Sequence, residues 1–146
     1  MSEIEKVRVD RILTLEDAAA FHGHEGPFLI LGYRAGIFAR KILEQETEFD
    51  LEVDVHIPFR TPFSCILDGL QCSTKCTWGK RNIRCYDDGK FMIRIKNRKT
   101  GKRVIMKLRD GFVEEFVRKP IEEAAMEAKN RGLNELFEIK ITSDHK

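Results

Sequence analysis

The sequence predicts an α+β fold: N-terminal helices, then a mixed, largely antiparallel sheet with a three-stranded meander, and a C-terminal helix. Apolar residues at helical spacing dominate the first third of the chain, period-two alternation fills residues 83–109, and helical spacing returns at 110–131. Helices segregated from antiparallel strands are typical of this class. We expect residues 1–146 to form one domain, since a chain of this length can bury a hydrophobic core.

Two helices are expected around the turn Phe21–Pro27, FHGHEGP. Thr14 is followed three residues later by an acid, a weak capping box that predicts a short helix ending at Gly23. Pro27 suits the first position of a second helix, which should continue to about residue 44. Gly32 and Gly36 lie on this helix and would let another backbone approach closely.

A third helix is expected to start at Thr61-Pro62, with an apolar face directed at the core. At 100° per residue, Cys65, Asp68 and Cys72 share a second stripe on this helix, and Cys76 would join it if the helix extended that far. An acid among thiols must find a partner or face a cleft.

Alternation of apolar and polar residues predicts the strands. The expected strands are 51–57, 83–86, 91–96, 103–109 and 137–141, and the middle three form the predicted meander. Two further helical segments, 110–119 and 120–131, are expected between the last two strands.

Charge is distributed unevenly along the chain. Residues 75–109 contain thirteen Lys and Arg and two Asp, a charge of +11 in a chain whose net charge is +2. We expect five of these cations on one face of the sheet: Arg84, Arg94, Lys96, Lys107 and Arg109. Such a face is either an ordinary solvated surface or a docking surface for an anionic partner. The near absence of interleaved aromatic residues argues against nucleic-acid binding.

The N-terminal residues 1–10 contain no apolar signal-like stretch, and no apolar run approaches the length of a membrane span. We therefore expect a cytoplasmic protein without a membrane association.

His22 and His24 are the first candidate site. In a regular helix they would diverge by about 200°, but Gly23 between them can end the helix and let both rings turn to one side. Histidine pairs suit a zinc-like site or general acid–base chemistry. The alternative is a helix end in which one ring caps carbonyl groups and the other is solvated.

The cysteines are the second candidate. Cys72 and Cys76 are four residues apart and could bind one soft ion from successive helical turns. Lys75, Lys80 and Arg81 lie close in sequence to Cys76 and are expected to lower its pKa. The other two cysteines, Cys65 and Cys85, are interpreted as core residues.

Two segments together resemble one family. FHGHEGPFLILGYRAG is similar to the F-H-G-H-x-C-P-G-L-x-x-G-x-R segment of FmdE, the E-type chain of formylmethanofuran dehydrogenase, and its relatives. LDGLQCSTKCTWGKRNI is similar to that family's D-A-I-Q-x-x-T-G-C-T-x-G-K-x-N segment, and the order and spacing of the two segments agree. Many members carry a C-terminal zinc ribbon, and since no C-x-x-C pair follows Cys85, we expect that module to be missing.

The resemblance implies an α+β homodimer of archaeal type with a metal site, most simply zinc or another divalent metal, where the two segments meet. It assigns that site to His22, His24, Asp68 and Cys76. It also implies partnership with formylmethanofuran dehydrogenase-type subunits, in an accessory role.

Two departures from the family pattern bear on the site. Gly26 stands where the family has a cysteine, and Cys72 stands where it has an aliphatic residue. One hypothesis is that Cys72 replaces the missing thiolate and binds the metal together with Cys76, with His22 or His24, and with a water or Asp68. The candidate metal ligands are therefore His22, His24, Cys72 and Cys76. The competing hypothesis is that the site has lost its metal.

The expected function is therefore that of a metal-binding FmdE-like protein, with enzymatic activity left open. If the chain is catalytic, the candidates are His24, Glu25 and Asp68. The alternative function is a non-catalytic assembly module with a degenerate metal site, which docks an acidic partner or anionic cofactor through the basic sheet face.

Overall fold

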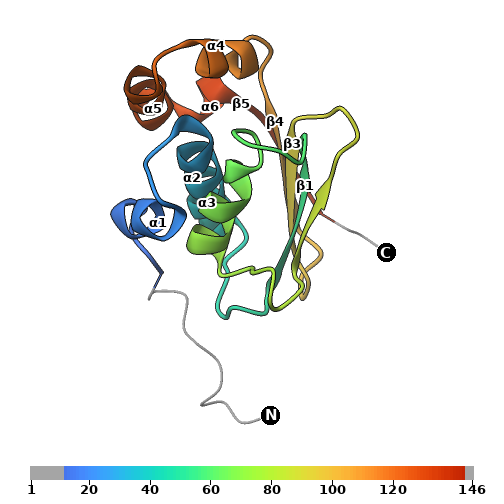
Figure 1. Ribbon diagram of the computed structural model, residues 1–146. Helices are drawn as coiled ribbons and strands as arrows, with labels where there is room; N and C mark the ends of the chain where they lie inside the picture. Colours follow the sequence, from blue (N-terminus) through green and yellow to red (C-terminus); the bar gives the residue numbers. More distant parts are fainter. Residues whose placement is uncertain (1–11, 144–146) are drawn as a thin grey trace.

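A computed structural model describes residues 12–143, so the N-terminal residues on which the expectation of a cytoplasmic location partly rests lie outside the described part. Helices cover one face of a five-stranded sheet, and a further group of helices lies at one end of it (Figure 1). The elements are α1 (Leu15–His22), α2 (Pro27–Ile42), β1 (Leu51–His56), α3 (Cys65–Thr74), β2 (Ile83–Tyr86), β3 (Met92–Asn97), β4 (Arg103–Leu108), α4 (Phe112–Arg118), α5 (Ile121–Asn130), α6 (Leu133–Leu136) and β5 (Phe137–Thr142). This architecture confirms the α+β class. Among the described residues, no helix is long and apolar enough to cross a membrane.

The sheet has the order β2-β1-β3-β4-β5, which corrects the predicted meander. The β3–β4 hairpin forms as expected, but β2 pairs with β1 in parallel and does not pair with β3. The antiparallel meander is instead β3-β4-β5. Because β1 and β2 are parallel, they need a crossover connection, and α3 supplies it.

The core lies between the sheet and the helices α2 and α3. Alternate strand residues such as Val53, Ile95 and Val104 are fully buried, as are Leu31 and Ala35 of α2. The intervening strand residues form the opposite face, which no described helix covers (Figure 1). The alternating pattern in the sequence therefore predicted the two faces correctly.

The N-terminal helices also follow their sequence signals. Thr14 and Asp17 exchange two capping hydrogen bonds of 3.0 and 3.1 Å, which start α1. Gly23 ends it with φ +119°, a conformation that favours glycine, and Pro27 opens α2.

The third helix starts later than expected, and its end settles the position of Cys76. It starts at Cys65, because residues 61–64 form turns. It ends at Thr74, because Lys75 adopts a left-handed conformation with φ 63°. Cys76 therefore leaves the helix and does not extend the Cys65/Asp68/Cys72 stripe.

Helices α2 and α3 approach closely at three glycines, and at two of them backbone meets backbone. A Cβ atom on Gly32 would overlap the carbonyl of Ile66, and one on Gly69 would overlap the carbonyl of Leu29. A Cβ atom on Gly36 would overlap the hydroxyl of Ser73. The close approach of another backbone that was predicted for the two α2 glycines is confirmed at Gly32, whereas Gly36 lies against side chains of α3, and α3 contributes a third glycine, Gly69.

We expect Gly69→Ala to destabilise the protein by at least about 2 kcal/mol, because its methyl group would meet backbone atoms of α2 that cannot move independently. Urea denaturation measures the free energy of unfolding. Gly79→Ala is the matched control, since a Cβ atom there meets nothing within 4 Å. Equal stability of the two variants would contradict backbone contact between the helices.

Candidate functional site

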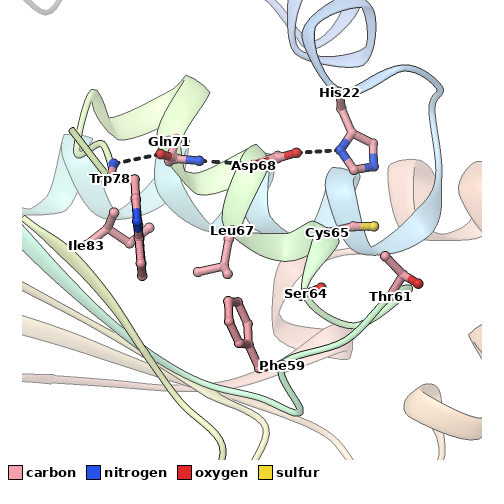
Figure 2. A pocket seen from close by; sticks show the side chains of 10 residues that line it. All are labelled: His22, Phe59, Thr61, Ser64, Cys65, Leu67, Asp68, Gln71, Trp78 and Ile83. Carbon is pink, nitrogen blue, oxygen red and sulfur yellow. Dashed lines mark hydrogen bonds and ion pairs between the residues drawn. The ribbon is translucent and has the colours of Figure 1, made fainter. Parts of the chain in front are cut away.

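The site is built on a hydrogen bond between the end of α1 and the middle of α3. His22 is the last residue of α1, and its Nδ1 lies 2.6 Å from Oδ2 of Asp68 (Figure 2). The His22 side chain is only 11% exposed. This contact joins the two segments that the sequence singled out.

Asp68 is itself held by a chain of hydrogen bonds. Its Oδ1 accepts a bond of 3.3 Å from Nε2 of Gln71, and Oε1 of Gln71 accepts one of 2.8 Å from the backbone N–H of Trp78. Figure 2 shows these side chains as a continuous line from Trp78 to His22. Both carboxylate oxygens are therefore engaged, and the imidazole has a fixed partner.

This line borders a cleft of about 380 Å³. Its polar part contains His22, Asp68 and Gln71 together with the thiol of Cys65 and the hydroxyls of Ser64 and Thr61. Its apolar part is formed by Phe59, Leu67, Trp78 and Ile83. A concave site with mostly apolar walls and a few convergent polar groups is the usual form of a small-molecule site.

The hydrogen bond determines what His22 can do. When Nδ1 donates its proton to a carboxylate, Nε2 carries the lone pair, and in Figure 2 it points away from Asp68. Such a nitrogen can bind a metal ion or accept a proton from a molecule in the cleft.

His24 and Glu25 lie outside the cleft. The His24 ring is exposed, and its centroid is 5.0 Å from that of His22. Glu25 forms an ion pair of 3.1 Å with Lys129 of α5. His22 is therefore better situated than either residue to exchange a proton with a bound molecule.

Gly26 lies directly beside His24. Its backbone is extended, and a Cβ atom there would be 3.1 Å from Nε2 of His24. The position that carries cysteine in the family pattern therefore adjoins the histidine pair.

Cys76 is fully buried and lies elsewhere. Its thiol donates a hydrogen bond of 3.2 Å to the carbonyl of Leu51, and burial raises the pKa of Cys76 to about 11. The predicted lowering of this pKa by nearby cations is therefore wrong, because desolvation outweighs the charge of Lys80.

Cys72 and Cys65 differ in their access to the cleft. Cys72 is buried and borders a separate hollow with Lys75 and Lys80. Cys65, which we expected in the core, is half-buried and lines the cleft with His22 and Asp68. Its position one helical turn before Asp68 was the signal that could have found it. Burial, followed by the charge of Asp68, raises the pKa of both thiols.

The structure thus brings His22, His24 and Asp68 together but does not gather the four predicted ligands, His22, His24, Cys72 and Cys76. Within residues 12–143, no three side chains of histidine, cysteine, aspartate or glutamate are arranged to hold a metal ion.

The Cys76 thiol should make stability depend on pH. Its pKa rises from an ordinary value of 9.0 to about 11 in the fold, so its contribution to stability is complete below pH 9 and is lost as the pH rises through 11. Between about pH 8.5 and 11.5 we expect wild type to lose about 2 kcal/mol more than Cys76→Ala, as measured by urea denaturation. Parallel pH profiles would show that the thiol is not buried as described.

Comparison with known proteins gives the family. The model of the family described as "FmdE, Molybdenum formylmethanofuran dehydrogenase operon" matches residues 21–143. A protein of Archaeoglobus fulgidus named "Probable S-adenosyl-L-methionine-binding protein" is 33% identical over 115 residues, which cover 78% of this chain and 30% of that protein. The chain therefore spans less than a third of this relative.

A solved structure has the same fold. It is that of a tungsten formylmethanofuran dehydrogenase FmdE-like protein from Syntrophus aciditrophicus, with a TM-score of 0.59 and 20% identity. The similarity covers 90% of this chain and 71% of that one. The family match extends over most of the sequence and includes both segments that meet at the His22–Asp68 contact, and the chain belongs to the FmdE family.

Proposed function

We propose that this chain is an accessory protein of formylmethanofuran dehydrogenase-type systems, and that its functional site is the cleft at His22 and Asp68. The observation that carries the proposal is the 2.6 Å hydrogen bond that orients the imidazole. The proposal includes an archaeal source, a cytoplasmic location, a homodimer and association with dehydrogenase subunits, which rest on the family resemblance.

We further propose that the histidines bind a divalent metal, zinc in the first instance. Two imidazoles on one tetrahedral zinc ion have ring centroids about 5 Å apart, as follows from zinc–nitrogen distances of about 2.1 Å. The rings of His22 and His24 are separated by 5.0 Å, so this pair fits. Cys76 does not fit, because its thiol is buried against Leu51 and has a raised pKa.

The proposed site is thus a two-histidine site in which Asp68 orients one ligand. Carboxylates that hold a metal-binding histidine in this way fix its tautomer. A bound zinc ion would supply a Lewis acid beside the cleft. With two protein ligands, the affinity should be modest compared with a complete tetrahedral site.

We expect Gly26→Cys to bind zinc at least about 100-fold more tightly than wild type, because the new side chain starts 3.1 Å from Nε2 of His24 and adds a thiolate ligand. Competition with a chromophoric chelator measures the affinity. Gly26→Ala is the matched control for the added Cβ atom. Similar zinc affinities of the two variants would contradict the proposal that this position adjoins the metal.

The same zinc titration distinguishes metal binding by the two histidines from metal binding that includes Cys72. His24→Ala should lose zinc binding, whereas Cys72→Ser should retain it, since Cys72 borders a different hollow. Loss of zinc in Cys72→Ser would instead support replacement of the family thiolate by Cys72. Absence of zinc binding by wild type would favour the degenerate site.

A second candidate function is docking through the open face of the sheet. Two of its cations are paired internally, because Arg84 and Arg94 both contact Asp54, at 2.8 and 3.2 Å, and Arg84 also contacts Glu52 at 3.2 Å. Arg109 lies beyond β4 and donates to the carbonyl of Asn134, so it does not belong to this face.

Three lysines remain as the basis of a docking surface. Lys96, Lys107 and Lys140 are on the open face and make no ion pair within residues 12–143. Unpaired cations on a sheet that no described helix covers favour an acidic partner.

We expect Lys96→Glu/Lys107→Glu to elute from immobilised heparin at a clearly lower salt concentration than wild type. The variant replaces two cations of the docking surface by carboxylates, so less salt is needed to screen the remaining contacts between charges. Lys41→Glu/Arg118→Glu is the matched control, since it makes the same charge change on α2 and α4. If both variants elute at equally lowered salt concentrations, only the total charge matters, and the proposal of a docking surface is wrong.

A further inference from the structure

Two large aromatic side chains remain exposed at the cleft. Trp78 is 58% exposed and Phe59 is 60% exposed, and both line the same cavity as His22 and Asp68. Trp78 is the only tryptophan of the chain. In Figure 2 it lies at the end of the cleft opposite His22, with Asp68 and Gln71 between them. Aromatic faces beside a concave polar site offer a surface on which a flat ring can pack.

The charge of the cleft limits the kind of ligand. None of the lining residues is Lys or Arg, and the ionisable lining residues are His22, Asp68 and the thiol of Cys65, whose pKa is raised by burial. In the metal-free cleft, a carboxylate or phosphate would therefore meet Asp68 without a Lys or Arg side chain to offset the repulsion. A neutral or cationic group would meet a carboxylate and the hydroxyls of Ser64 and Thr61.

We propose that the cleft binds a small molecule with a flat aromatic ring that carries a neutral or cationic hydrogen-bonding group. The ring packs on Trp78 and Phe59, and the polar group reaches Asp68 and His22. The volume of about 380 Å³ is at the lower end of the range for small-molecule sites, about 300–1,000 Å³. This inference rests on the proposed function for the location of the site and adds the ligand class.

Gln71 connects the two ends of the cleft. It accepts a hydrogen bond from the backbone of Trp78 and donates one to Asp68, which holds His22. A ring bound against Trp78 therefore lies next to the segment that helps to fix the imidazole.

The test uses the single indole N–H resonance of Trp78 in the full chain, with EDTA present so that metal plays no part. The probes are benzylamine, benzoate and cyclohexylmethylamine, which separate the effect of charge from that of the ring. We expect a saturable shift with benzylamine and at least tenfold weaker binding of the other two. Equal shifts for all three probes, or no shift, would overturn the proposal.

Variants assign the binding to the cleft. Phe59→Leu should weaken benzylamine binding about fivefold, as expected for loss of one aromatic contact. Asp68→Asn should remove the preference for benzylamine over benzoate. Tyr86→Leu, which changes an exposed aromatic residue on the open sheet face, should have no effect.

Two further outcomes are informative. A shift of the indole resonance with protein concentration alone would indicate that a second copy covers the aromatic residues, and would overturn the ligand proposal. Loss of the ring preference in a protein whose zinc titration behaves as expected would overturn this inference and leave the metal proposal intact.

Discussion

The backbone contact between α2 and α3 is the constraint on which the site depends. Gly69 follows Asp68 directly and lies against Leu29 of α2, so the helix that carries the carboxylate is fixed close to its neighbour. The helix α1, which ends at His22, packs on both. A hydrogen bond of 2.6 Å tolerates little displacement of either helix. The glycines, which carry no functional group, therefore determine the geometry of the groups that do.

The sequence predicted best those features that depend on neighbouring residues. Capping at Thr14, termination at Gly23 and the start at Pro27 are local, and all three are confirmed. The alternating pattern also identified the faces of the strands, but it contains no information about which strand lies next to which. The insertion of β1 between β2 and β3 depends on the crossover through α3, which is a property of the whole chain.

The site was predictable to a similar degree. His22 and Asp68 could be identified because an unusual histidine pair and an acid among apolar residues both require partners. Cys76 could not be located, because its position follows from a single left-handed residue, Lys75, that ends α3. The pKa of Cys76 could not be predicted from sequence neighbours either, since burial exceeds their effect. Sequence patterns thus identified residues that need a partner better than they identified the partners.

A second histidine–carboxylate pair shows what distinguishes the first. His56 and Asp88 are joined by a hydrogen bond of 2.8 Å, nearly as short as that of His22 and Asp68. However, the His56 ring stacks on Tyr86, with centroids 5.0 Å apart, and the only cavity that it borders among those described holds about 10 Å³. No cavity large enough for a small molecule is therefore described beside this pair. The pairing of an imidazole with a carboxylate is therefore not sufficient to identify a functional site. The open cleft and the neighbouring His24 are what favour His22 over His56 as the functional histidine.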